Sequence, residues 1–294
     1  MANLKEIRNR ISSVGSTMQI TSAMKMVSAA KLKRAQDAVT QMRPYAGKLR
    51  EILENLSATL DLSENAYAEQ REVKKVLIVG ITSNRGLCGG YNAGVLRATE
   101  GEIKADAIKG RSHTVVAIGR KAEGYFRFRG YNVAKSFTGF TDSPTYAIAK
   151  EVGEFVTELY ASGQVDRVEL VYTRFISSGT QEVVQRPLVP LESETVAGGD
   201  AKNAAGADYE FEPSPEAILE TLLPRYVEAR VYAAMLNAAA SEHAFRQRAM
   251  KSATDNAEEL INNLSRIMNR ARQDSITTEI MEIVGGAEAM SSGN

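Results

Sequence analysis

Residues 250–271 read MKSATDNAEELINNLSRIMNRA, and this stretch decides the fold of the chain. Apolar and small side chains recur in it by alternating steps of three and four, which is typical of the seam of a left-handed coiled coil. From residue 216 to residue 284, Pro224 is the only proline. The pattern therefore predicts one very long helix. Its expected seam positions are Met250, Ala253, Ala257, Leu260, Leu264, Ile267 and Ala271.

Such a helix is too long for a globular domain. At about 1.5 Å per residue, the helical residues after Pro224 would span roughly 90 Å. A globule of 294 residues has a radius of gyration of only about 19 Å. We therefore expect the helix to project and to need a partner for its apolar seam.

The other end of the chain supplies that partner. Residues 1–58 repeat the three-four step, and Pro44 either kinks this helix or shifts its register. The two terminal helices are expected to wind antiparallel around each other. The seam positions of the first helix are Leu4, Ile7, Ile11, Val14, Met18, Thr21, Lys25, Ser28, Leu32, Ala35, Val39 and Met42.

The middle of the chain has a different period. VLIVGIT (76–82), HTVVAIG (113–119) and VDRVELVYTRF (165–175) are β-branched runs typical of buried parallel strands, and QEVVQRPLVP (181–190) suits an edge strand. Helical stretches alternate with these runs, and Ser143-Pro144 is expected to cap the last one. This alternation predicts a small Rossmann-like α/β domain. The expected helices are Asn92–Ala107, Arg120–Phe128 and Pro144–Ala161.

The expected fold class is thus α/β plus a long coiled coil. We divide the chain into a helix over 1–58, an α/β domain over 73–192, a loop insertion over 193–215 and a second helix over 216–290. The insertion is rich in Gly, Ala, Asp and Pro.

Charge and composition exclude several functions. Lys plus Arg and Asp plus Glu both total 36, so the overall charge does not indicate a nucleic-acid partner. Ten Lys and Arg in residues 1–50 against Glu6 and Asp37 indicate a basic solvated face, or a basic shaft inside an acidic partner. The start MANLKEIRNR has no apolar region of a secretory signal. No apolar run is long enough to span a bilayer.

The one enzyme-like motif is the glycine-rich SNRGLCGGYN (83–92), which follows a strand and opens a helix. Such turns can hold phosphate on free backbone N–H groups. However, the glycines do not follow G-x-G-x-x-G, and no G-K-[ST] follows. We interpret the motif as a structural turn, with a bound nucleotide as the alternative. Cys88 and His243 lack the partners of a catalytic site, and we predict no catalytic residue, metal or cofactor.

Four blocks of the sequence resemble one known family. They are KEIRNRISSVGSTMQITSAMKMVSAAKLKRAQ (5–36), SNRGLCGGYN (83–92), ASEHAFRQRAMKSATDNA (240–257) and ATDNAEELINNLSRIMNRARQDSITTEIMEIVGGAEAM (253–290). In this order they resemble the gamma subunit of the F-type ATP synthase, the central rotor shaft of that complex. The last block carries that family's signature of Ile276, Thr277, Glu279, Glu282, Gly286, Ala287 and Ala289.

The resemblance implies a mechanism without a catalytic role for this chain. The paired terminal helices would stand inside a ring of three alpha and three beta subunits. The α/β domain would sit on the membrane rotor ring with the epsilon subunit. Proton flow would turn the ring and the shaft, and the asymmetric shaft would drive ATP synthesis or hydrolysis on the beta subunits.

The resemblance also implies contact residues. Met24 and Lys25 would face the lower part of a beta subunit, although Lys25 also reads as a register-setting polar seam position. Arg272, Gln273 and Thr277 would hydrogen-bond a beta-subunit loop, with Arg272 offering its planar fork to a carboxylate.

The rest of the implied contacts lie at the tip of the shaft and near the ring. Tyr209 and Glu212 align with residues near the ring. An apolar tip that turns inside an apolar surface of its partners makes only non-directional contacts, so rotation would break no specific bond. The implied tip residues are Ile280, Met281, Ile283, Val284 and Met290.

Two other classes stay open on the residues alone: a nucleotide-binding α/β enzyme with helical dimerisation arms, and a coiled-coil scaffold that forms homodimers. The single cysteine, Cys88, argues against the redox regulation of chloroplast members. The absence of a transit peptide favours a bacterial protein. We then expect a peripheral protein on the cytoplasmic side of the inner or plasma membrane, held there only through its complex.

Overall fold

The computed structural model describes residues 4–59, 71–190 and 214–291. The chain forms two compact units, one of Met1–Val27 with Gln247–Asn294 and the other of Ser28–Arg246. Within the described ranges, no helix is both long and apolar enough to cross a bilayer.

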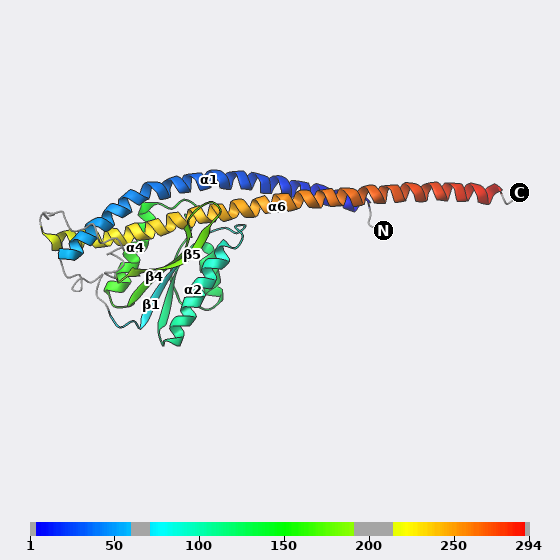
Figure 1. Cartoon of the computed structure of the whole chain (residues 1–294). Helices are drawn as coiled ribbons and strands as arrows, with labels where there is room; N and C mark the ends of the chain where they lie inside the picture. The colour runs from blue at the N-terminus through cyan, green and yellow to red at the C-terminus, as the bar shows by residue number, and fades with distance from the viewer. Residues whose placement is uncertain (1–3, 60–70, 191–213, 292–294) are drawn as a thin grey trace. The chain divides into compact units, whose positions relative to one another are not determined.

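Two long helices confirm the predicted pair. Helix α1 spans Leu4–Thr59 and helix α6 spans Pro215–Ser291 (Figure 1). Each contains one internal proline, Pro44 and Pro224 respectively, without ending there. The Oγ of Ser214 accepts a hydrogen bond from the backbone N–H of Ala217 at 3.3 Å, so Ser214 caps the start of α6.

The second unit contains a five-stranded sheet in the order β3-β2-β1-β4-β5. The first four strands are parallel, and β5 pairs antiparallel with β4 at the edge. All four strands expected from the sequence are present. Strand β3 was not expected, because its VAKSF sequence is short, half polar and only partly buried at the other edge. The strands are β1 (Lys75–Ile81), β2 (Ser112–Ile118), β3 (Val133–Phe137), β4 (Arg167–Phe175) and β5 (Gln181–Val189).

Three shorter helices connect the strands: α2 (Tyr91–Ile108), α3 (Arg120–Phe128) and α4 (Tyr146–Ala161). The expected start of α4 at Ser143-Pro144 is wrong, because Thr145 takes the N-cap position. The backbone N–H of Ser143 donates to the carbonyl of Phe140 at 2.9 Å, so this residue belongs to the preceding turn.

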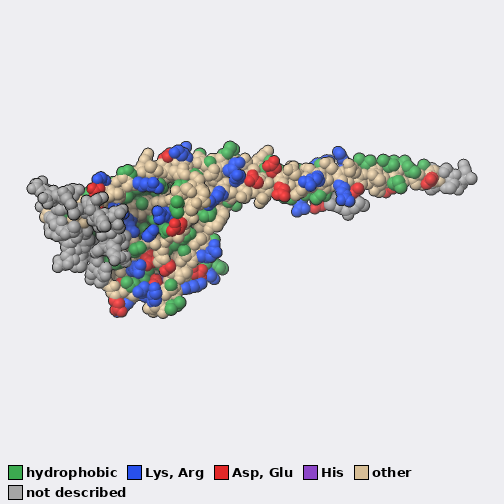
Figure 2. Space-filling view, in the orientation of Figure 1, with side chains coloured by type: hydrophobic (Ala, Val, Ile, Leu, Met, Phe, Trp, Pro, Cys, Tyr) green, Lys and Arg blue, Asp and Glu red, His purple; other side chains and the backbone are tan. Residues whose placement is uncertain are grey.

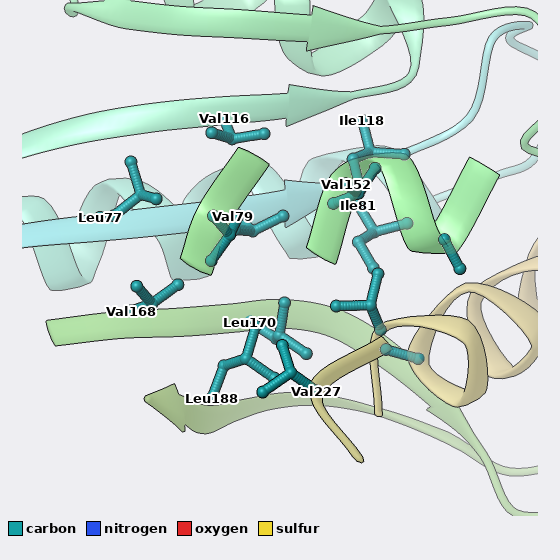
Figure 3. Packing of buried hydrophobic residues seen from close by; sticks show 14 of the residues in the cluster. Leu77, Val79, Ile81, Val116, Ile118, Val152, Val168, Leu170, Leu188 and Val227 are labelled. Carbon is teal, nitrogen blue, oxygen red and sulfur yellow. The ribbon is translucent and has the colours of Figure 1, made fainter. Parts of the chain in front are cut away.

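Both faces of the sheet are covered. Helices α2 and α3 pack on one face, around Val95, Ile103 and Phe126. The other face packs against α4 and against part of α6, as Figure 3 shows for Val152 and Val227. The α/β domain therefore takes part of its own core from the long helix. The α6 residues in this core are Val227, Val231, Ala234, Met235 and Ala238.

Helix α1 packs mainly on α6. In the second unit, Leu32 and Val39 of α1 share an apolar cluster with Leu236 and Ala240 of α6. Phe175 at the end of β4 packs against the same cluster. Farther along α1, Leu53 packs with the α6 end near Leu219 and Leu223. In the first unit the hydroxyls of Thr21 and Thr254 are 2.9 Å apart across the pair. Residues later in α1 contact residues earlier in α6, which confirms the antiparallel pairing.

The seam predicted for α1 is confirmed, because none of its twelve positions is exposed. The α6 seam is partly wrong: Leu260 and Ile267 are 46% and 53% exposed. Ile261 and Met268 are half-buried in their place. Each pair offers two adjacent apolar residues, and after Ala257 the helix takes a step of four before a step of three.

This corrected register predicts that two leucine substitutions lower the free energy of unfolding by unequal amounts. Leu264 is buried in the seam, so Leu264→Ala should lower the free energy of unfolding by about 2 kcal/mol. The exposed Leu260 is the matched control, and Leu260→Ala should cost less than about 0.5 kcal/mol. Urea unfolding of the full chain, followed by circular dichroism, measures both. Equal losses would contradict the assigned register.

Candidate partner-contact site

The end of α6 extends past its partner helix within the first unit. Among the described α6 side chains, Ser275 is the last with partial cover, and every one from 276 to 288 is exposed. Helix α1 is described only from Leu4 onward. In the described structure, this end of α6 is therefore a single helix with all of its faces open to water.

This open end is apolar to an unusual degree. Five large apolar side chains lie there with exposed fractions between 49% and 72%. Figure 2 shows the hydrophobic side chains gathered along this end of the molecule. A contiguous exposed apolar surface in a water-facing helix marks a contact site. The five residues are Ile276, Ile280, Met281, Ile283 and Val284.

Helical spacing brings most of the expected contact residues together. Gln273, Thr277, Ile280 and Val284 follow steps of four, three and four, and therefore lie along one face of α6. Ile276 was not named among the contact candidates, although it belongs to the same exposed surface. Its place in the matched signature could have indicated it.

Arg272 is exposed beside this face. Within the described part of the chain it forms no ion pair, so its guanidinium is available to another molecule. Met24 and Lys25 lie on α1 and are both half-buried. For Lys25 this agrees with its expected seam position. Tyr209 and Glu212 lie outside the described residues, and the side chain of Met290 is likewise not described.

Further exposed apolar side chains lie along the same two-helix unit. Leu260 and Ile267 on α6, and Ile20 and Val27 on α1, are each seven residues apart and at least 46% exposed. These four were missed as contact candidates. The seven-residue spacing of Leu260 and Ile267 was visible in the sequence, but it was assigned to the buried seam.

The glycine-rich turn is the other candidate site. It follows β1 at the carboxyl edge of the sheet, between β1 and β4, where parallel α/β folds bind ligands. Its polar groups bond to one another: Asn92 Oδ1 accepts from the backbone N–H of Ser83 at 2.9 Å, and Asn92 Nδ2 lies 3.1 Å from the Sγ of Cys88. Leu87 has a φ of 61°, which gives the turn its tight reversal.

Helix α6 fills the crevice beside this turn. The Oγ of Ser241 donates to the carbonyl of Thr173 in β4 at 3.0 Å. Arg246 donates to the carbonyl of Gly86 at 3.3 Å and pairs with Glu242 at 2.7 Å. All three α6 side chains are buried. These α6 side chains therefore bond to the turn and to the end of β4, and a ligand at this edge would have to compete with them.

The two side chains considered for catalysis are poorly placed for it. Burial raises the pKa of the Cys88 thiol, which disfavours the nucleophilic thiolate. Burial lowers the pKa of His243, whose Nε2 lies 3.2 Å from the carbonyl oxygen of Asp142. Both residues are buried and serve the packing of α6 against the carboxyl edge of the sheet. The polar groups of the turn bond within the chain, and its purely structural role stays a prediction.

These features define a class of protein: an assembly subunit with a pair of long helices, an exposed apolar helix end and an α/β domain whose core includes part of one of these helices. The family model described as ATP synthase matches residues 3–290. An ATP synthase gamma chain from Flavobacterium johnsoniae is 50% identical over 294 residues, covering 99% of each chain. One from Heliobacterium modesticaldum is 46% identical, covering 99% of this chain and 100% of its own length.

Solved structures agree with this match. A chain in the central stalk and c-ring of the Tetrahymena thermophila mitochondrial ATP synthase is 27% identical with a TM-score of 0.60, covering 80% of this chain and 99% of its own. A chain of the Euglena gracilis mitochondrial ATP synthase has a TM-score of 0.70 and covers 99% of this chain and 95% of its own. At 20% identity, the second shows the fold alone.

The chain belongs to the ATP synthase gamma chain family. It is a central-stalk rotor subunit and takes no catalytic part, which confirms the family resemblance found in the sequence. The alternatives of a nucleotide-binding enzyme and of a stand-alone coiled-coil scaffold are thereby set aside.

The filled crevice predicts that this chain does not bind nucleotide by itself. Equilibrium dialysis of the full chain against millimolar ATP should show no saturable binding, because α6 occupies the carboxyl edge between β1 and β4. Serum albumin at the same concentration serves as the control for non-specific retention. Saturable binding that Gly86→Val abolishes would contradict the assignment of a structural turn.

Proposed function

We propose that this chain couples proton flow through a membrane rotor ring to ATP synthesis or hydrolysis by rotating inside a ring of three alpha and three beta subunits. The observation that carries the proposal is the bare apolar end of α6, which projects beyond the start of α1 in the first unit. Such a surface is costly in water and is stabilised by an enclosing partner.

The chain divides functionally into a shaft and a foot. Residues 1–58 and 216–290 form the shaft, which stands inside the ring of catalytic subunits. The α/β domain over 73–192 forms the foot, with the epsilon subunit and the membrane rotor ring as its partners. The loop insertion predicted over 193–215 lies, up to residue 213, outside the described residues, and we assign its Tyr209 and Glu212 to the ring side. The complex holds the chain on the cytoplasmic side of the inner or plasma membrane.

Coupling then follows from the asymmetry of the shaft. A ligand shifts a conformational equilibrium only by its differential affinity for the two states. Around α6 the neighbouring faces differ: one face carries the polar Gln273 and Thr277 together with apolar residues, whereas the next carries the apolar Ile276 and Ile283. Each orientation of the shaft therefore offers different contacts to each beta subunit. Rotation drives the three sites through different affinities in turn.

The proposed contacts follow the same division. Met24 and Lys25 face the lower part of a beta subunit. Arg272, Gln273 and Thr277 hydrogen-bond a beta-subunit loop, and the exposed guanidinium of Arg272, which forms no ion pair with the described residues, supports this role. The apolar tip turns in an apolar sleeve, where contacts are non-directional and exchange at little cost. The tip residues are Ile280, Met281, Ile283, Val284 and Met290.

The subunit composition of the isolated complex tests the proposed partners. The tagged chain, isolated from detergent-solubilised membranes, should bring down three alpha and three beta subunits per copy, together with ATPase activity. A tagged unrelated membrane protein controls for carry-over. A homodimer without ATPase activity would contradict the proposal.

Arg272 should affect coupling more than chemistry. Arg272→Ala should reduce ATP-driven proton pumping per ATP hydrolysed by about tenfold or less, because a charge-assisted bidentate pair is lost from the contact. Arg272→Lys should restore only part of it, since an ammonium cannot replace the planar fork. Inverted vesicles allow both rates to be measured, with Arg266→Ala as the control on the two-helix segment. Unchanged pumping and assembly in Arg272→Ala would show that the assignment is wrong.

A further inference from the structure

Helix α1 is set apart from the α/β domain over part of its length, within the Ser28–Arg246 unit. A cavity of about 470 Å³ lies between α1 and the end of β4, lined among others by Val39, Arg43 and Phe175. A second cavity, of about 300 Å³, is lined among others by Ala35 and Asp142. Packing in this region therefore ties α1 to α6 more than to the sheet domain.

A salt bridge spans the gap at the second cavity. Lys31 Nζ of α1 lies 2.7 Å from Asp142 Oδ2, in the segment that follows β3. The two side chains are 41% and 37% exposed. Lys31 holds the pKa of Asp142 below its ordinary value, so the carboxylate is charged at neutral pH. Because both residues line the cavity, the bridge closes one side of a gap that apolar packing does not fill.

The segment that carries Asp142 is itself anchored at three points. The backbone N–H of Gly139 donates to Asn84 Oδ1 at 3.2 Å, and the backbone N–H of Asn84 donates to Thr141 Oγ1 at 3.1 Å. The carbonyl oxygen of Asp142 lies 3.2 Å from Nε2 of His243 on α6. Residues 139–142 thus connect the turn after β1, helix α6 and helix α1.

The two shaft helices depend differently on these contacts. Helix α6 contributes Val227 and Val231 to the core of the sheet and cannot slide without disrupting it. Helix α1 follows the domain through its seam with α6, through the partly buried Phe175 at the end of β4, and through polar contacts such as Lys31–Asp142 and Gln36–Ser178, the latter at 3.4 Å. A twisting load on the α/β domain reaches α6 directly and reaches α1 through these weaker connections.

We propose that Asp142 is a positioning residue of the rotor: with Lys31 it fixes α1 to the α/β domain, so that the domain passes rotation to both shaft helices together. The inference rests on the proposed rotor function. Without the bridge, α1 shears over the two cavities when the domain is loaded, and part of each rotation is lost as internal strain of the shaft.

The test uses the purified complex in vesicles with four variants: Asp142→Asn, Lys31→Gln, the exchanged pair Lys31→Asp with Asp142→Lys, and Lys33→Gln as control. Lys33 pairs with Asp37 at 2.7 Å within α1 and does not reach the domain. Each single change at the bridge should make amide exchange over residues 28–42 about two- to fivefold faster. Proton pumping per ATP should fall about twofold, and ATP hydrolysis should stay unchanged.

The exchanged pair should recover pumping and slow amide exchange, because the attraction is restored with its sign reversed. High salt should reduce pumping in the unmodified complex more than in Asp142→Asn, since a half-exposed pair is screened. Unchanged exchange and pumping in both single variants would overturn the proposal, as would an exchanged pair no better than the singles. An unmodified complex without ATP-driven pumping would instead contradict the proposed rotor function.

Discussion

The structure depends on one constraint: an apolar seam on a long helix has to be covered wherever it runs. In the first unit α1 covers α6 up to about Ser275, and in the second unit it covers α6 around Leu236 and Leu223. Past Ser275 no described part of the chain covers α6, and its apolar side chains face water. The free energy that this exposure costs in the isolated chain is available for binding in a complex.

A second consequence is that α6 serves two structures at once. Its early part completes the core of the sheet, and its side chains around Ser241 to Arg246 fill the crevice that a related fold would use for a ligand. The same packing also has a mechanical consequence. The part of α6 that lies in the sheet's own core cannot turn independently of it, so the domain and this part of the helix move as one body.

The sequence predicted most of this fold, for identifiable reasons. The β-branched runs of β1, β2 and β4 are buried on both faces and leave an unmistakable pattern. Edge strand β3 leaves little pattern, because only part of it is buried. The predicted seam is wrong at Leu260 and Ile267. Ile261 and Met268 are also apolar, and only the position of the partner helix decides which of two adjacent apolar residues is covered.

The candidate site was predicted to a smaller extent. The spacing of Gln273, Thr277 and Ile280 places them on one helix face, but spacing alone does not tell an exposed face from a covered one. The exposure of that face follows from where α1 begins relative to α6, which is a property of the folded pair. The contacts themselves depend on partner surfaces that this chain does not encode, so they stay predictions.

The central claim is that the whole chain turns inside its complex, and observation of single complexes tests it most directly. The catalytic ring is fixed to a surface, and a probe is attached to the α/β domain through a cysteine introduced at the exposed Phe128, with Cys88 replaced by serine. The account predicts that the probe rotates in one direction while ATP is hydrolysed and pauses three times per revolution, once for each beta subunit. A probe that stays still, or only fluctuates, while hydrolysis proceeds at its full rate would contradict the account.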